Sequence, residues 1–474
     1  MSHPPAVKPS VELRRALGLL DAGALVAGTV IGTGIFLVPS TIAREVGSVA
    51  GVFLVWLVGG LLSLAGALSY AELGAAFPEA GGEYVFLRRA YGPLWGFLFG
   101  WQQVVIGKTG SIASVATALA IFLGFFFEGV QGEVISLAVG ESTWTLTGLQ
   151  LIALGGVLLL TTLNYLGIAV GGAIQRSLTI VKVVAILVLV SVALGSGKGT
   201  WAHFQSYPDL SPGSTDRWLG FGTALAAALW AYDGWNNLTM VGAEIRNPHT
   251  TIPRVLILGM LGVMVVYLLA NFSYFYILPL GSVIRSERVA QDVAVTAVGH
   301  WGGTAITLAA LVSTFASLNG AILTGARVSY AMARDGLFFR HMADLNPAHH
   351  TPAKALVLQC LVACSLILIL GHDQYAFERL FNYAIFGTWV FYGITALAVI
   401  VLRYRQPDLP RPYRTLGYPW VPLTFVAVAG AFCLSMIVRR PHETGLGLAF
   451  LAAGLPFYAY WRFFGHNPTP DPEL

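Results

Sequence analysis

Apolar runs of about twenty residues or more recur from end to end of the chain, and they limit the fold more than any other feature. A run of that length is what a helix needs to cross roughly 30 Å of hydrocarbon. The composition agrees, with 56% hydrophobic and 11% charged residues and a mean hydropathy of +0.71, because soluble domains carry roughly 25% charged residues. The sequence therefore predicts an all-α, polytopic membrane protein.

We expect twelve transmembrane helices. They cover residues 17–43, 51–76, 94–127, 148–164, 174–194, 218–243, 253–278, 302–333, 353–370, 377–402, 420–438 and 444–464. No loop is long enough to fold as a separate soluble domain. The expected organisation is a cytoplasmic tail over 1–16, a core of ten spans over 17–402, and two further spans with a cytoplasmic C-terminal tail over 403–474.

Lys and Arg set the expected orientation. One set of alternate loops and tails carries roughly sixteen of them and the other about eight, and the richer side stays in the cytoplasm. Both termini are therefore expected in the cytoplasm, with the chain in a plasma or inner cell membrane. No basic block indicates nucleic-acid binding, and nothing indicates a metal or a cofactor. The three cysteines, Cys360, Cys364 and Cys433, receive no role.

Two of the expected spans are interrupted. In the first, TVIGTGIF (29–36) and the residue before it place Gly28, Gly32 and Gly34 where lipid offers the backbone no water. In the sixth, WAYDGWNN (230–237) brings a carboxylate, a glycine and two amides into an apolar segment. Interrupted spans five apart are typical of a five-plus-five inverted repeat with a binding site between the two broken helices. The alternative, a small-residue pattern that lets helices approach closely, accounts for Gly28 and Gly32 but not for Gly34 or the second break.

A broken helix presents backbone N–H groups on one side of its gap and carbonyl groups on the other, with helix dipoles of matching sign. A zwitterion with a carboxylate and an ammonium fits such a gap. We expect the N–H groups around Thr33 and Gly34 to take the carboxylate. The ammonium is expected at carbonyls near Val30, Trp230 and Asp233.

Several motifs carry a family resemblance: GTVIGTGIF (28–36), PEAGGEYVFLRRAYG (78–92), LWAYDGWNN (229–237), EIRNPHTTIPR (244–254) and RPYRTLGYPWVP (411–422). Together they resemble the L-type amino acid transporters of the amino acid, polyamine and organocation superfamily, in a bacterial-type member. The resemblance covers residues 11–422 and is specific for the family rather than for the substrate. It implies the carboxylate and ammonium contacts given above, and an aromatic gate over the substrate at Trp230.

Lys182, in TIVKVVAIL, places an ammonium inside the fifth span. Because such a charge costs roughly 2.5 to 3.5 kcal/mol at the centre of a span, we expect it to face the interior with partners. The resemblance implies that it substitutes for a sodium ion and ties the first span to the eighth. The candidate partners are carbonyls near Gly28 and hydroxyls among Ser313, Thr314 and Ser317. The alternatives are snorkelling to the interface and a proton-coupled cycle in which the buried Lys loses its proton.

Other polar residues lie in or near the interrupted region. Lys108 and Asn236 are candidates for the pocket or for coupling. Asp233 is acidic where related sequences more often carry a small residue, so it is expected to balance Lys108 or Lys182 or to tune the charge preference. The loop 128–147 lacks the cysteine through which animal members join a partner glycoprotein, so no disulfide-linked partner is expected.

These features predict a secondary active transporter of neutral, small zwitterionic L-amino acids that works by alternating access. Exchange is the expected mode, because a fixed Lys182 would replace the ion that otherwise drives uptake. The alternatives are a proton-coupled symporter, a cationic amino acid or polyamine carrier, and a receptor that binds an amino acid without moving it. No HExxH or GxSxG motif is present, so no enzymatic activity is expected. The expected partners are the amino acid and the lipid bilayer.

Overall fold

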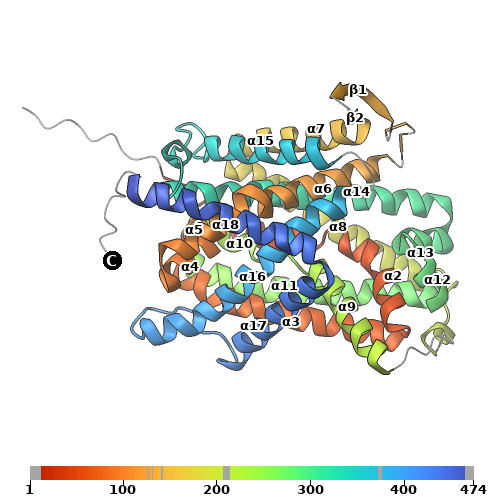
Figure 1. The fold of residues 1–474 in the computed structure, drawn as a ribbon. Helices are drawn as coiled ribbons and strands as arrows, with labels where there is room; N and C mark the ends of the chain where they lie inside the picture. The colour runs from red at the N-terminus through yellow and green to blue at the C-terminus, as the bar shows by residue number, and fades with distance from the viewer. Residues whose placement is uncertain are drawn as a thin grey trace, which may run out of the picture.

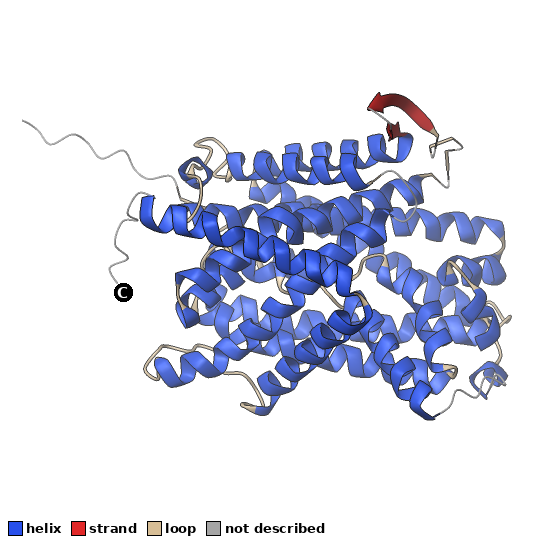
Figure 2. Cartoon of the chain, in the orientation of Figure 1, coloured by secondary structure: helices blue, strands red, loops and turns tan. Residues whose placement is uncertain are grey.

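The structure, a computed structural model, describes residues 12–124, 126–127, 129–130, 132–139, 142–205, 214–371 and 376–464. Residues 1–11 and 465–474 of the two expected tails lie outside the described residues. Helices make up most of what is described, and they pack lengthwise against one another in one bundle (Figures 1 and 2).

The first half of the chain contains nine helices and a hairpin among its described residues. They are α1 (Leu19–Val30), α2 (Gly34–Val46), α3 (Val49–Ala76), α4 (Glu83–Tyr91), α5 (Pro93–Gln102), the π-helical turn η1 (Gln103–Gly107), α6 (Lys108–Leu123), the strands β1 (Glu133–Val139) and β2 (Ser142–Thr147), α7 (Gly148–Tyr165) and α8 (Ile168–Gly195).

The second half contains helices and no strand among its described residues. It contains η2 (Trp201–Gln205), α9 (Ser214–Ala231), α10 (Asn237–Met240), η3 (Gly242–Glu244), α11 (Pro248–Ile277), α12 (Leu280–Arg285), α13 (Val289–Val298), α14 (His300–Arg334), η4 (Arg340–Ala343), α15 (Ala353–Leu370), α16 (Ala376–Arg405), α17 (Trp420–Arg439) and α18 (Pro441–Phe464).

Nine described helical segments, one of them made of α5, η1 and α6 together, are long and apolar enough to cross a membrane. There are ten if α1 and α2, which are bent by 41° at their break, form one span. The sequence predicted twelve. The two expected spans that fall short are the sixth, where α9 ends at Ala231, and the last, α18, which carries the polar residues His442, Glu443 and Arg462.

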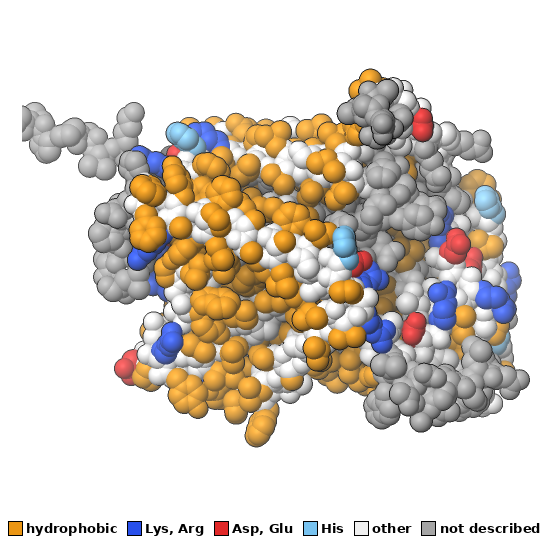
Figure 3. Space-filling view, viewed as in Figure 1, with side chains coloured by type: hydrophobic (Ala, Val, Ile, Leu, Met, Phe, Trp, Pro, Cys, Tyr) orange, Lys and Arg blue, Asp and Glu red, His pale blue; other side chains and the backbone are white. Residues whose placement is uncertain are grey.

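The outer surface fits a hydrocarbon environment. On the face shown in Figure 3, hydrophobic side chains cover the middle, and charged side chains gather toward the left and right ends. Along α8, Ile180, Val181, Val184 and Val188 are each more than half exposed. Soluble monomers rarely leave so large an apolar surface uncovered, and the chain is therefore a multi-pass membrane protein.

Two connections contain more structure than the sequence predicted. Strands β1 and β2 pair as an antiparallel hairpin inside the expected loop 128–147, so the chain is not all-α there. The hairpin sequences EVISLAV and STWTLT are rich in Val, Ile, Thr and Trp, which favour strands. Between α11 and α14, the connection folds into the short helices α12 and α13.

Candidate functional site

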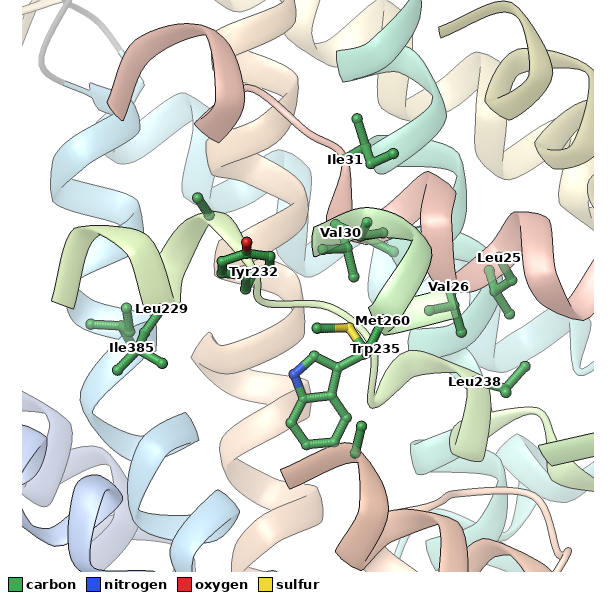
Figure 4. Close-up of a cluster of buried hydrophobic side chains, with 14 of the residues drawn as sticks. Leu25, Val26, Val30, Ile31, Leu229, Tyr232, Trp235, Leu238, Met260 and Ile385 are labelled. Carbon is green, nitrogen blue, oxygen red and sulfur yellow. The ribbon is translucent and has the colours of Figure 1, made fainter. Parts of the chain in front are cut away.

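The two interrupted helices meet at their breaks. Helix α1 ends at Val30 and α2 begins at Gly34, while α9 ends at Ala231 and α10 begins at Asn237. The Thr29 hydroxyl donates to the Gly234 carbonyl at 2.9 Å, which joins one break to the other. In Figure 4, Val30 at the end of α1 lies beside Tyr232 of the second break.

Glycines allow this close approach. A Cβ on Gly34 would lie 2.8 Å from the Cβ of Ala231 and 2.9 Å from its Cα, closer than real side chains come. Gly234 has a φ of +112°, which disfavours residues with a side chain. These glycines therefore interrupt each helix and also allow the two breaks to contact each other.

The hydroxyl of Tyr267, on α11, lies between the ends of the two interrupted helices. It is 2.9 Å from the carbonyl oxygen of Val30 and 2.9 Å from that of Ala231. Tyr267 is fully buried, so its single hydroxyl proton is shared between these two carbonyls without competition from bulk water. Each carbonyl is one that an intact helix would have paired internally.

The breaks open into a cavity of about 130 Å³. Its lining combines both breaks with residues of η1, α6, α14 and α16. The lining residues are Thr29, Val30, Gly32, Thr33, Gly34, Gln103, Gly107, Lys108, Ser111, Ser114, Val115, Trp230, Ala231, Asp233, Gly234, Asn236, Asn237, Thr314, Ser317, Ala321, Thr388 and Tyr392. All five residues expected to bind the substrate lie on this wall.

The wall offers hydrogen-bond donors at the start of α2. The N–H groups of Thr33 and Gly34 donate to no backbone carbonyl among the described residues, as expected of groups at a helix N-terminus. Of the carbonyls expected for an ammonium, that of Val30 already accepts from Tyr267 and, at 2.8 Å, from the N–H of Gly32. The Trp230 carbonyl accepts from the Asp233 N–H at 3.1 Å.

Lys182 lies behind the first break and is fully buried. Its Nζ donates to the carbonyls of Gly28 at 2.8 Å, Ile31 at 2.5 Å and Ser313 at 3.0 Å. It does not snorkel. It therefore connects α8 to both the first break and α14.

The hydroxyls expected around Lys182 are placed differently from the prediction. Ser313 offers Lys182 its backbone carbonyl, while its hydroxyl donates to the Ile31 carbonyl at 2.9 Å. The Ser317 hydroxyl donates to the Gly28 carbonyl at 3.2 Å. The Thr314 hydroxyl donates to the Ala310 carbonyl of its own helix at 2.8 Å. Backbone carbonyls suit an ammonium better than hydroxyls here, because they accept without needing to donate in turn.

The second break carries ionisable groups instead. Asp233 faces the cavity, and its Oδ1 accepts from the Tyr392 hydroxyl of α16 at 2.7 Å. Lys108, which follows the π-helical turn η1, donates to the Asn237 Oδ1. Asn236 bonds to a different partner: its Nδ2 donates to Glu83 Oε1 at 2.6 Å.

Sequence reasoning missed Glu83, Asn237, Tyr267 and Tyr392. Asn237 could have been found, because it completes the same polar interruption as Asn236. Glu83 had a weak signal, a carboxylate after two glycines at the start of a helix. Tyr267 and Tyr392 stand in apolar helices among many aromatic residues, and nothing in the sequence sets them apart.

Among the described residues, no group of three or more His, Cys, Asp or Glu side chains could hold a metal ion. Two buried glutamates outside the cavity form ion pairs with arginines. Arg327 pairs with Glu244 at 2.8 Å, while Arg403 and Arg411 pair with Glu72 at 2.7 and 3.5 Å. The Arg327–Glu244 pair joins α14 to η3.

Two interrupted helices that face each other across a polar cavity, inside a multi-pass bundle, define a class of membrane transport proteins. The comparison with known sequences agrees. The chain belongs to the amino acid permease family, which matches residues 17–453. This match confirms the sequence-based predictions of a transporter of the amino acid, polyamine and organocation superfamily and of a protein that is not an enzyme.

Relatives match along almost their whole length. The serine/threonine exchanger SteT of Bacillus subtilis is 33% identical over 451 residues, which are 94% of this chain and 96% of the relative. The human b(0,+)-type amino acid transporter 1 is 30% identical over 95% of this chain and 88% of its own. The human cystine/glutamate transporter is 29% identical over 98% and 88%.

Proposed function

We propose that this protein exchanges small neutral L-amino acids across a cell membrane by alternating access. One observation carries the proposal: the N-terminus of α2, whose Thr33 and Gly34 N–H groups donate to no backbone carbonyl among the described residues, and the second break, with the Asp233 carboxylate, line the same cavity. The substrate carboxylate binds at Thr33 and Gly34, and the ammonium binds beside Trp230 and Asp233, where the Asp233 carboxylate supplies a countercharge. Trp230 forms the gate over the bound substrate.

The size and polarity of the cavity support a small substrate. A cavity of about 150 Å³ holds a molecule the size of benzene, which is close to the size of alanine or serine, and this cavity measures about 130 Å³. Hydroxyls of Ser111, Ser114 and Thr388 line it. The exchanger most similar among the relatives named above takes serine and threonine by its name.

Exchange rather than ion-driven uptake follows from Lys182. Its ammonium occupies, with three carbonyl contacts, the position between the first break and α14 where a mobile cation would otherwise bind. Because Lys182 is covalently fixed, it supplies no ion gradient. Without an ion gradient to drive net uptake, we expect the protein to reorient fastest with an amino acid bound, and this favours one-for-one exchange.

We further infer twelve spans in a five-plus-five inverted repeat, with α9–α10 as the sixth span and α18 as the twelfth. Both termini lie in the cytoplasm by the distribution of Lys and Arg. The protein works without a disulfide-linked partner, since the connection between α6 and α7 contains no cysteine. A cationic substrate is disfavoured because the Lys108 ammonium lines the cavity.

Transport into proteoliposomes tests the proposal. A panel of labelled amino acids is offered to vesicles that are empty or preloaded with unlabelled substrate, with and without a pH gradient. Uptake of a small neutral amino acid chiefly into preloaded vesicles is the expected result. Binding without flux would indicate a receptor, and preferential uptake of lysine, arginine or a polyamine would overturn the substrate class.

A further inference from the structure

The carboxyl group of Glu83 differs from two other buried glutamates. Glu244 and Glu72 each form an ion pair with an arginine, at 2.8 and 2.7 Å. Glu83 is 0% exposed, yet the described residues place no cationic side chain within ion-pair distance of it. Its Oε1 accepts from Asn236, while its Oε2 is buried without a hydrogen-bond partner in the part of the chain that the structure describes.

The surroundings of Glu83 bring four ionisable groups to it from different elements. Lys108 of α6 and Asp233 of the second break act on it electrostatically. The phenols of Tyr70 from α3 and Tyr392 from α16 also interact with it electrostatically. Lys182 is separate, because its ammonium is held by carbonyls on the far side of the first break.

The charges of this cluster do not balance. With Lys108, Asp233 and Glu83 all ionised, it carries one net negative charge. One proton on a carboxylate makes it neutral, which a buried cluster that also receives a net-neutral zwitterion favours. Asp233 is partly exposed to the cavity and accepts from Tyr392 at 2.7 Å. Glu83 is fully enclosed with one unpaired oxygen, so its charged form is the costlier of the two.

We propose that Glu83 is a proton-binding site and that the substrate-loaded protein reorients with Glu83 as a neutral carboxylic acid. The inference rests on the proposed amino acid transport. A hydronium ion on one side of the membrane gives a proton to Glu83 Oε2, so that one of its O–H bonds breaks as the O–H bond of the acid forms and a water molecule is left. On the other side that O–H bond breaks, and the proton passes to a water molecule to form hydronium. Asn236 connects the two sites, because it lines the cavity and also bonds Glu83.

The hydrogen bond between Glu83 and Asn236 explains how protonation of Glu83 would affect the second break. Glu83 begins α4, whereas Asn236 belongs to the second break. A hydrogen bond to an ionised carboxylate is shorter and stronger than one to a neutral acid. Ionised Glu83 therefore holds the second break against α4, and protonation weakens this hold and lets the break move.

The test is the rate of exchange of labelled for unlabelled substrate in proteoliposomes with equal pH on both sides, measured over a pH series. In the unmodified protein the rate falls as pH rises, approaching about tenfold per pH unit above the pKa of the carboxyl. Glu83→Gln keeps an oxygen that accepts from Asn236 and resembles the protonated acid. This variant is expected to exchange at a rate independent of pH.

Glu79→Gln is the matched control, because Glu79 lies four residues earlier and is partly exposed beside Arg89 at 3.2 Å. It should keep the pH profile of the unmodified protein. Should Glu83→Gln fail to insert, Glu83→Asp gives a second test, since it retains a titratable carboxyl and should retain the fall at high pH.

Several results would overturn the proton site. They are a flat profile in the unmodified protein, an unchanged pH dependence in Glu83→Gln, loss of that dependence in Asp233→Asn but not in Glu83→Gln, and stimulation by sodium in place of protons. The absence of exchange of any amino acid by the unmodified protein would instead contradict the proposed function. The two failures are therefore distinguishable.

Discussion

The two breaks are similar in backbone and different in what holds them. At the first, the carbonyls that the interrupted helix leaves unpaired are satisfied by the fixed ammonium of Lys182 and by hydroxyls of α14. At the second, Asp233 and Asn236 bond to Tyr392 and Glu83, which lie on other helices. The carbonyls of the first break are thus paired with permanent partners, whereas the second break depends on groups that can change their charge. Under the proposed function, the first break holds the substrate carboxylate, and the second break holds the ammonium and responds to protonation.

The test with the largest expected effect removes the cation at the first break. Lys182→Ala deletes three donor contacts, each worth about 1 kcal/mol. A loss of about 3 kcal/mol corresponds to roughly a hundredfold fall in transport. Exchange by purified protein in proteoliposomes measures it.

Lys198→Ala is its control, because Lys198 lies beyond the end of α8 and donates to the Thr296 carbonyl at the surface. Both variants need to elute as folded protein before transport is compared. Unchanged exchange in Lys182→Ala would show that the first break does not need a fixed cation.

A second test forces the breaks apart. Gly34→Ala places a Cβ 2.8 Å from that of Ala231, and such overpacking costs about 1 to 3 kcal/mol. Because the displaced groups include the expected carboxylate donors, we expect the KM for substrate to rise about tenfold or more. Gly23→Ala, on α1, meets nothing within 4 Å and should leave the KM unchanged. Equal KM values in the two variants would contradict the binding assignment of the first break.

A third, smaller test addresses the second break. Tyr392→Phe removes the hydroxyl that donates to Asp233 at 2.7 Å. Because Asp233 faces the cavity, water replaces part of that bond, and we expect a cost of about 1 kcal/mol, or roughly a fivefold rise in KM. Tyr404→Phe, on the same helix but 80% exposed, is the control. A larger effect than that of Gly34→Ala would reverse the ranking of the two breaks.

The smallest effect is expected where the first break has a second donor. Ser317→Ala removes one hydroxyl from the Gly28 carbonyl, which keeps its bond from Lys182. The free energy of unfolding should fall by about 1 kcal/mol or less, as measured by thermal unfolding in detergent. Ser365→Ala, an exposed serine that bonds within its own helix, should change it less. If thermal unfolding showed as large a loss of stability in Ser317→Ala as in Lys182→Ala, the Gly28 carbonyl would not be adequately paired by Lys182 alone.

The sequence predicted those features of the two breaks that lie within a single helical segment. Glycines at 28, 32 and 34 and the polar run from Asp233 to Asn236 interrupt apolar segments, and an interruption is visible without any tertiary structure. The burial of Lys182 was also predictable, because lipid offers an ammonium no partner.

The sequence could not show which residues that are far apart in the chain form hydrogen bonds with each other. Glu83 and Asn236 are 153 positions apart, and only the tertiary fold brings them together. The phenol of Tyr267 bridges two helix ends that are themselves far apart in the chain. The hairpin after α6 was missed because a hydropathy pattern assigns any short polar connection to a loop.

The π-helical turn at Gln103–Gly107 has a consequence for how such a cavity can diversify. A π turn holds one more residue than an α turn, and one residue corresponds to about 100° of rotation. Deleting a single residue there would turn Lys108, Ser111 and Ser114 off the wall together while the helix stayed nearly as long. A one-codon deletion could thus exchange a whole strip of the lining at once, a route to new substrates that point substitutions would reach only through several steps.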